Sequence, residues 1–186
     1  MGRVSQAQAE ENRRRVVDTA SALFREQGTH VSVADLMKAA GLTHGAFYKQ
    51  FASKEALVDE ATAHAFIELA RRHTAGLERY DGQRDAAQQA LIDTYLSVQH
   101  RDDPADGCPV AALATDIARE GGGREARRVY TEGVADFAAF LASDDQDGIV
   151  RLCTLFGALV LSRATKGSSL SEEILAAAHA ALTETG

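Results

Sequence analysis

The segment VSVADLMKAAGLTHGAFYKQF, residues 31–51, limits the possible folds of this chain more strongly than any other stretch. Ser32, followed three positions later by Asp35, is typical of a residue that caps a helix N-terminus. Gly41 suits the left-handed backbone conformation that ends a helix, because it has no side chain to clash there. Between these two signals, one apolar face of about two helical turns is formed by Val33, Leu36, Met37 and Ala40. We therefore predict a short, capped helix that ends in a glycine turn.

A second short helix follows the glycine turn. Thr43 is expected to cap it, and Phe47 and Phe51, four residues apart, are expected to hold its inner face. Two short helices joined by a glycine turn are a helix-turn-helix candidate. The outward residues of the second helix are then His44, Gly45, Tyr48 and Lys49. Their hydroxyl, imidazole and ammonium groups suit phosphates and base edges, although spacing alone is equally consistent with a solvent-exposed helical hairpin.

Helical signals extend over the rest of the chain. An amphipathic helix is expected over 9–27, ending at Gly28, and another begins after the cap residue Ser53 and runs to Gly76. Turn signals divide the remainder into five more helical stretches. With two prolines and 45% hydrophobic residues, the composition favours an all-α fold. The longest nearly apolar run, 152–162, is too short to span a membrane.

The charge of the chain is unevenly distributed. Its net charge is −7, but residues 1–54 contain eight Lys or Arg and five Asp or Glu, a balance of +3 that leaves −10 for the remainder. The front part therefore suits a polyanion better than the rest does. The N-terminus lacks a signal-peptide pattern, so we expect a cytoplasmic protein with no membrane partner.

The sequence carries no pattern typical of catalysis or of cofactor binding. Cys108 and Cys153 are far apart and lack the spacing of a zinc site, so we expect no metal. The six histidines are scattered, with no nucleophile elbow, metal-spaced pair or glycine-rich phosphate loop around them. The segment HRDDPADG, residues 100–107, is expected to be a solvated turn. We expect no cofactor and no enzymatic activity.

Residues 28–61, GTHVSVADLMKAAGLTHGAFYKQFASKEALVDEA, resemble the DNA-binding domain of TetR-family transcriptional regulators. The resemblance is strong over residues 10–65. It is carried by Gly28, by the helix start at Ser32 and Val33, by the turn glycine Gly41, and by the Tyr-x-x-Phe-x-x-Lys pattern at 48–54. It implies that the residues facing DNA are Ser32, Val33, Thr43, His44, Gly45, Tyr48, Lys49 and Lys54. His44 departs from the family pattern, because many members carry arginine, lysine or proline there.

The same resemblance implies an architecture and a function. A helix-turn-helix DNA-binding domain over residues 1–53 is expected to precede a ligand-binding and dimerisation domain over residues 54–186, with about nine helices in all. By this resemblance we expect a homodimeric transcriptional regulator that binds a palindromic double-stranded DNA operator. We further expect a repressor that a small-molecule inducer releases from DNA. The helix after Ser53 is expected to couple the inducer site to the DNA-binding helices.

Two further sets of residues are candidates for sites in the C-terminal part. The last two helices are rich in apolar residues and are expected to form the homodimer interface. The expected interface residues are Leu152, Phe156, Leu159, Val160, Ile174 and Ala178. The inducer site is expected among the middle helices, at Phe66, His73, Tyr95, Gln99, Cys108, Leu113, Tyr130 and Phe137. For both sets the alternative is that the side chains simply form the core.

Cys108 supports an alternative to ligand-induced release. It lies between Gly107 and Pro109 at an expected helix start, where the helix dipole lowers the pKa of a thiol and makes the thiol more reactive. A regulator that oxidants or electrophiles switch through Cys108 is therefore the second functional hypothesis. The simpler interpretation is that Cys108 packs as a small hydrophobic side chain.

Overall fold

The computed structural model describes residues 6–119, 123–143 and 147–183. These residues form ten helices and no strand: α1 (Gln6–Gln27), α2 (Val33–Ala39), α3 (His44–Phe47), α4 (Lys54–Arg79), α5 (Arg84–Tyr95), α6 (Val98–Asp102), α7 (Pro109–Ala118), α8 (Arg124–Leu141), α9 (Gly148–Ala164) and α10 (Ser169–Thr183). The predicted all-α fold class is confirmed. The helix beyond the expected nine is α6, which forms because Ser97 caps a new helix through a hydrogen bond from the His100 N–H at 3.1 Å. None of these helices is long and apolar enough to cross a membrane.

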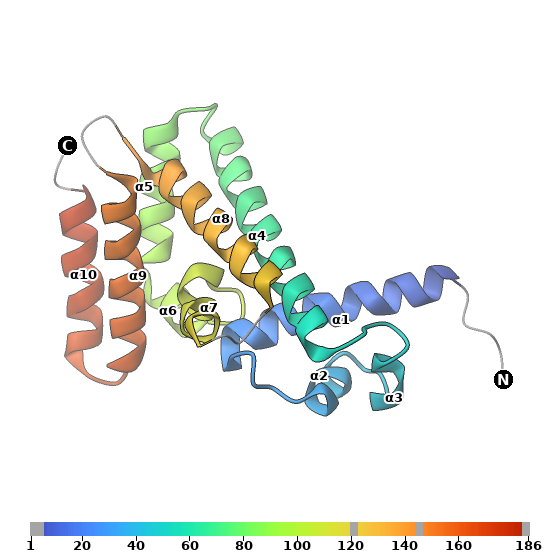
Figure 1. The fold of residues 1–186 in the computed structure, drawn as a ribbon. Helices are drawn as coiled ribbons and strands as arrows, with labels where there is room; N and C mark the ends of the chain where they lie inside the picture. Colours follow the sequence, from blue (N-terminus) through green and yellow to red (C-terminus); the bar gives the residue numbers. More distant parts are fainter. Residues whose placement is uncertain (1–5, 120–122, 144–146, 184–186) are drawn as a thin grey trace.

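The helices form a front group and a rear group (Figure 1). At the front, α2 and α3 lie together below α1 and the start of α4. At the rear, α9 and α10 pack as a pair on the opposite side of the molecule. Between these groups α4 and α8 run side by side, and α7 contacts α1, α4, α8 and α9. The long helix α4 and the short helix α7 therefore connect the two groups.

The turn between α2 and α3 has the predicted chemistry. The Ser32 hydroxyl accepts a hydrogen bond from the Asp35 N–H at 3.1 Å and so caps α2. Gly41 has a φ of 71°, in the left-handed region. The Leu42 N–H donates to the Met37 carbonyl at 2.8 Å, which closes the end of α2. The predicted cap and the predicted glycine turn are both confirmed.

The caps of the next two helices differ from each other. The Ser53 hydroxyl accepts a hydrogen bond from the Ala56 N–H at 3.1 Å, which confirms the predicted cap of α4. Thr43 has the extended backbone of a cap residue, but its hydroxyl makes no cap hydrogen bond to α3. The prediction that the Thr43 side chain caps α3 is therefore wrong. The start of this single turn is closed by the backbone instead, where the Ala46 N–H donates to the Thr43 carbonyl at 2.9 Å.

The buried apolar side chains form two clusters. The front cluster joins α1, α2 and α3 to residues of the helices that connect the two groups, including Leu57 and Val58 of α4 and Leu113 and Ile117 of α7. The rear cluster is built from α4, α5, α7, α8, α9 and α10. The expected boundary between residues 53 and 54 coincides with the start of α4, but the front core extends past it. We retain 1–53 and 54–186 as a proposed division of the chain by role.

Gly41→Ala is expected to lower the free energy of unfolding by about 1 kcal/mol, because an alanine in the left-handed region clashes with its own backbone. Contact with neighbours is not the cause, since a Cβ at Gly41 meets no atom within 4 Å. Gly45 is a matched control, because it has equally open surroundings but no left-handed φ. Gly45→Ala, inside α3, is expected to raise stability by up to ~1 kcal/mol. Chemical denaturation measures both values, and equal free energies for the two variants would contradict this account.

Candidate functional site

The exposed side of α3 rests on two buried aromatic rings. Phe47 and Phe51 are 0% and 3% exposed, and their rings stack with centroids 5.4 Å apart. Tyr48 is 66% exposed and packs edge-on against Phe47 at 5.1 Å, while the His44 ring stacks on Tyr48 at 5.8 Å. These contacts hold the side chains through their rings. Within the described residues, no hydrogen bond occupies the Tyr48 hydroxyl or the His44 nitrogens.

The eight residues expected to face DNA lie on or beside α2, α3 and the first turn of α4. Six of them are exposed, and Val33 and Lys54 are half-buried. The Ser32 hydroxyl is already engaged, because it donates to an Asp35 carboxylate oxygen at 2.6 Å. The structure groups five of the exposed residues on α3 and directly before and after it, and we call this surface the α3 face: Thr43, His44, Gly45, Tyr48 and Lys49.

Arg13 of α1 supports the α3 face from behind and was not identified from the sequence. Its guanidinium lies 4.4 Å from the centre of the Phe51 ring, donates to the Gln50 carbonyl and pairs with Glu60 of α4. It therefore ties the end of the helix-turn-helix to both long front helices. No local pattern distinguishes Arg13 from the two arginines that follow it, since its role depends on tertiary packing.

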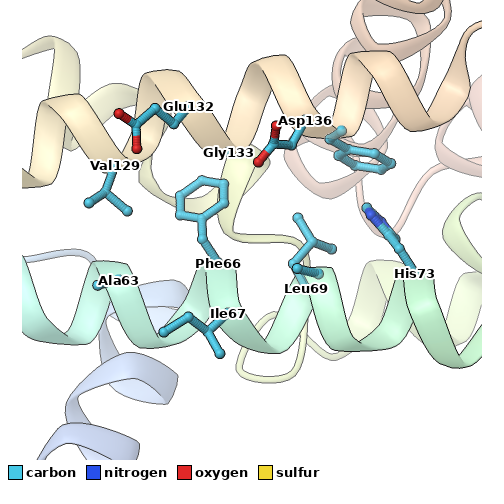
Figure 2. Close-up of a pocket in the computed structure, with 11 residues that line it drawn as sticks. Ala63, Phe66, Ile67, Leu69, His73, Val129, Glu132, Gly133 and Asp136 are labelled. Carbon is cyan, nitrogen blue, oxygen red and sulfur yellow. The ribbon is translucent and has the colours of Figure 1, made fainter.

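A pocket with a volume of about 320 Å³ lies between α4 and α8, and we call it the α4–α8 pocket. Figure 2 shows Phe66, Leu69 and His73 projecting from α4 toward α8. The helices approach closely at Gly133, where a Cβ would lie 2.0 Å from the Phe66 ring. The Phe66 ring therefore occupies space that only a glycine in α8 leaves free. The acidic residues of the pocket are Glu132 and Asp136 on α8.

A second cavity, with a volume of about 240 Å³, adjoins this pocket and shares Leu69, His73 and Phe137 with it. It is bounded by α4, α5, α8 and the start of α7, and we call it the Tyr95 cavity. Two buried polar atoms of its lining, the Tyr95 hydroxyl and His73 Nε2, have no hydrogen-bond partner among the described residues. Unpaired buried polar atoms are uncommon and costly, so they indicate where a bound molecule can supply a partner.

Burial keeps both of these groups uncharged near neutral pH. It lowers the pKa of His73 to about 4 and raises the pKa of Tyr95 well above its usual value. The His73 ring also lies flat against Phe140, with centroids 4.4 Å apart and planes 10° apart. A neutral imidazole and a neutral phenol can each donate and accept hydrogen bonds. The cavity therefore presents polar groups without presenting charge at these two positions.

Cys108 lies in the wall of the Tyr95 cavity, next to His100. The Cys108 N–H donates to His100 Nε2 at 3.3 Å, so this nitrogen is the acceptor. His100 Nδ1 then carries the proton and donates to the Tyr95 carbonyl at 2.8 Å. The interpretation of residues 100–107 as a solvated turn is therefore wrong at its start, because residues 100–102 belong to α6, His100 is half-buried and joins α5 to the start of α7, and Arg101 is buried.

Burial also decides the acidity of the Cys108 thiol. It raises the pKa of Cys108 and outweighs the backbone N–H groups at the start of α7, which favour the thiolate. The expectation of a lowered pKa is therefore wrong. The thiol and the Tyr95 hydroxyl are close enough for each to shift the pKa of the other, although their geometry is not that of a hydrogen bond.

The two spaces are lined by five of the eight predicted ligand residues: Phe66, His73, Tyr95, Cys108 and Phe137. Gln99 is exposed on α6, and Leu113 is 2% exposed in the front core. Tyr130 packs edge-on against Phe66 and donates its hydroxyl to the Val110 carbonyl at 2.8 Å. These three residues line neither space. Sequence reasoning missed several lining residues, among them Leu69, Leu91, Thr94 and His100.

The predicted dimer residues do not share one face of the chain. Leu152 and Leu159 are 4% and 0% exposed and belong to the rear core, so a second chain cannot reach them. Val160 is exposed, whereas Phe156, Ile174 and Ala178 are half-buried against the same core. We therefore revise the expected contact surface to the exposed apolar side chains of α9. We call it the α9 face: Ile149, Val150, Cys153, Val160 and Leu161.

The exposed α3 face and the cavities behind it define a helix-turn-helix protein with a cavity-bearing helical body. Residues 16–61 match the family described as bacterial regulatory proteins, tetR family. The HTH-type transcriptional regulator AcrR from Shigella flexneri is 39% identical over 61 residues, which make up 32% of this chain and 28% of that protein. The front part of the chain is therefore similar to TetR-family regulators in sequence. The match spans less than a third of the length of this curated relative.

Solved structures show the same fold over nearly the whole chain. The reduced form of Escherichia coli NemR is 20% identical with a TM-score of 0.76, and the match covers 94% of this chain and 96% of that one. A TetR transcriptional regulator from Chloroflexus aurantiacus is 21% identical with a TM-score of 0.71, covering 95% and 94%. A TetR-family regulator from Agrobacterium tumefaciens is 18% identical with a TM-score of 0.74, covering 95% of each chain. The likeness therefore extends to the helical body, as a likeness of fold.

Tyr95→Phe is expected to leave the free energy of unfolding unchanged or to raise it by ~1 kcal/mol, because it removes a buried hydroxyl that has no partner among the described residues. Tyr130→Phe is the matched control. Its hydroxyl is bonded to the Val110 carbonyl, so its removal is expected to cost about 1 kcal/mol. Thermal and chemical denaturation compare the two variants. An equal loss in both would mean that the Tyr95 hydroxyl has a structural partner.

Proposed function

We propose that the chain is a homodimeric, cytoplasmic transcriptional repressor that binds a palindromic double-stranded DNA operator and leaves it when a small-molecule inducer enters the interior cavities. The observation that carries this proposal is the α3 face, which is exposed and is held by the buried Phe47 and Phe51 rings within the family's helix-turn-helix. An exposed helix of this kind fits the major groove, where its side chains meet phosphates and base edges.

The residues of the α3 face suggest separate roles in DNA binding. The Tyr48 hydroxyl and the Lys49 ammonium are suited to phosphates, and Lys54 at the start of α4 can add a further charge. Thr43 keeps its hydroxyl free of a cap hydrogen bond, so both it and His44 can reach base edges. His44 replaces the arginine, lysine or proline of many relatives, and we propose that it contributes an operator preference of this protein.

A second chain would contact the α9 face. Val150, Val160 and Leu161 are 63%, 39% and 56% exposed, which is unusual for side chains of this size and type. Gly157, between them along α9, has open space around it and permits close approach of another helix. Two copies related by a two-fold axis would present two α3 faces, and a spacing of about 34 Å between them would match successive major grooves. This arrangement supports a palindromic operator.

Two helices can transmit occupancy of the cavities to the α3 face. α4 contributes Leu57 to the front core and Phe66 to the α4–α8 pocket. α7 begins beside Cys108 in the wall of the Tyr95 cavity, and near its end Asp116 accepts a hydrogen bond from the Thr29 N–H at 2.6 Å. A ligand that changes the spacing of α4, α7 and α8 would therefore shift the helix-turn-helix and so favour the unbound form.

Tyr48→Ala and Lys49→Ala are each expected to weaken operator binding by about tenfold, because each removes a phosphate contact. The probe is a duplex that contains the inverted repeat upstream of the protein's own gene, and fluorescence anisotropy over a salt series gives the affinity. Lys49→Ala should also reduce the slope of log affinity against log salt by about one. Two chains should bind per inverted repeat.

Lys166→Ala is the control for this experiment. Lys166 is an exposed cation in the turn between α9 and α10, on the side of the molecule away from α2 and α3 (Figure 1). Its replacement should leave the affinity and the salt slope unchanged. If the unmodified chain binds no inverted repeat, or if Tyr48→Ala binds as tightly as the unmodified chain, the proposed DNA-binding function fails.

A second candidate function is release from DNA through modification of Cys108 by oxidants or electrophiles. It is favoured by the position of Cys108 in the wall of the Tyr95 cavity, where a modified thiol would take up space that an inducer would otherwise fill. The E. coli NemR structure of similar fold is of a form described as reduced. Against this function, the thiol is 5% exposed and burial raises its pKa, which slows its reaction.

Cys108→Ser separates the two functions. If Cys108 is the switch, hydrogen peroxide or an alkylating electrophile should release the unmodified chain from its operator and leave Cys108→Ser bound. Cys153→Ser tests the other thiol, which is exposed in the α9 face and belongs to neither space, and it should still be released if Cys108 is the switch. Release of Cys108→Ser by the same reagents would rule out the Cys108 switch.

A further inference from the structure

The Tyr95 cavity contains two buried polar atoms that the described part of the chain leaves without a partner. Tyr95 is 6% exposed, and its hydroxyl is unbonded. His73 Nε2 is buried and unbonded as well. The two side chains line one cavity from different helices, α5 and α4. A molecule that bonds to both restores hydrogen bonds that each group lost when folding removed it from water.

The remaining walls of the cavity suit an aromatic ring. Phe137 lies next to both polar side chains, with its ring centroid 4.7 Å from that of His73 and 6.3 Å from that of Tyr95. Leu69 and Leu91 add aliphatic surface. The volume of 240 Å³ exceeds the roughly 150 Å³ of an engineered apolar cavity that binds benzene. One ring with small substituents therefore fits.

The charges around the cavity favour a neutral ligand. Arg72 is the cation in the cavity lining, but its guanidinium donates to the Asp106 carbonyl at 2.9 Å and pairs with the Asp106 carboxylate. Arg163 acts electrostatically on Tyr95 from outside the lining, and its guanidinium donates to two backbone carbonyls. An anionic ligand would therefore lose its hydration without meeting a free guanidinium in the cavity wall. His73 and Tyr95 are themselves uncharged near neutral pH, because burial lowers the pKa of the imidazole and raises that of the phenol.

We propose that the Tyr95 cavity binds a small neutral phenol, with its ring against Phe137 and its hydroxyl bonded to the Tyr95 hydroxyl and to His73 Nε2. A ligand hydroxyl both donates and accepts, so it complements either tautomer of His73 and either orientation of the Tyr95 hydroxyl, whereas a carbonyl oxygen accepts only. The proposal rests on the proposed function, because it names the chemical class of the inducer.

The test compares p-cresol with p-xylene, which has a methyl group in place of the hydroxyl and nearly the same shape. Isothermal titration of the full chain should show p-cresol binding about tenfold more tightly than p-xylene, the value of one or two recovered hydrogen bonds. Tyr95→Phe and His73→Phe should each weaken p-cresol binding by up to about tenfold and leave p-xylene binding unchanged. Both variants keep a ring at the substituted position, and a thermal melt confirms that each is folded.

Tyr130→Phe is the control, because it removes a tyrosine hydroxyl that is already bonded to the Val110 carbonyl and lines neither space. It should bind p-cresol as the unmodified chain does. Equal affinity for p-cresol and p-xylene would overturn the proposal, as would undiminished p-cresol binding by both Tyr95→Phe and His73→Phe. p-Toluate carries a carboxylate in place of the hydroxyl of p-cresol. Tighter binding of p-toluate than of p-cresol would also overturn the proposal, because it would show that a cation in the cavity pairs with the ligand.

Operator binding is measured separately, so the two proposals can fail independently. p-Cresol that binds with the expected dependence on Tyr95 and His73 supports the phenol site even if no operator is found. Both proposals are supported if p-cresol releases the unmodified chain from the operator but does not release Tyr95→Phe. An operator-binding chain that fails to distinguish p-cresol from p-xylene retains the regulatory function and loses the phenol site.

Discussion

The continuity of α4 is the constraint on which the rest of the structure depends. This one helix, Lys54–Arg79, contributes Leu57 and Val58 to the front core and Phe66 and His73 to the cavities. Its backbone hydrogen bonds are internal, so it moves as a rod rather than bending freely between its two ends. The front and rear clusters therefore cannot rearrange independently. The Tyr95 cavity, beside His73, is linked through α4 to α2 and α3, which do not line it.

α7 is a second connection between the front and rear cores. Val110 lies in the rear core, and Ile117, two turns later, lies in the front core. At the front end of α7, the Asp116 carboxylate holds the chain just after the turn at Gly28, whose φ of 86° sets the path toward α2. The front group is therefore attached to the rear core through both α4 and α7, so a change in the separation of these helices would move it.

Signals confined to a few neighbouring residues were predicted well from the sequence. Ser32, Gly41 and Ser53 act through their own backbone and through partners within a few positions, so their roles follow from residue type. Residues whose role depends on packing were not predicted from the sequence. His100 stands in a polar segment yet bonds to Tyr95 and Cys108, and the apolar periodicity that marks α9 does not say which of its sides faces the core. The exposure of the α3 face could therefore be predicted from the sequence, whereas the residues that line the cavities could be predicted only in part.

The Tyr95 cavity is lined by two buried polar atoms that have no hydrogen-bond partner among the described residues. Unpaired buried atoms also occur singly elsewhere in the described chain, at Gln50, Thr62 and Arg151 Nε, whereas two of them, from Tyr95 and His73, line this one cavity. A phenylalanine at position 95 would fill nearly the same volume without an unpaired hydroxyl. Proteins depart from such local rules chiefly at functional sites, where the lost stability is offset by what the site does. The placement of two unpaired polar atoms in one cavity is the observation on which the proposed phenol site rests.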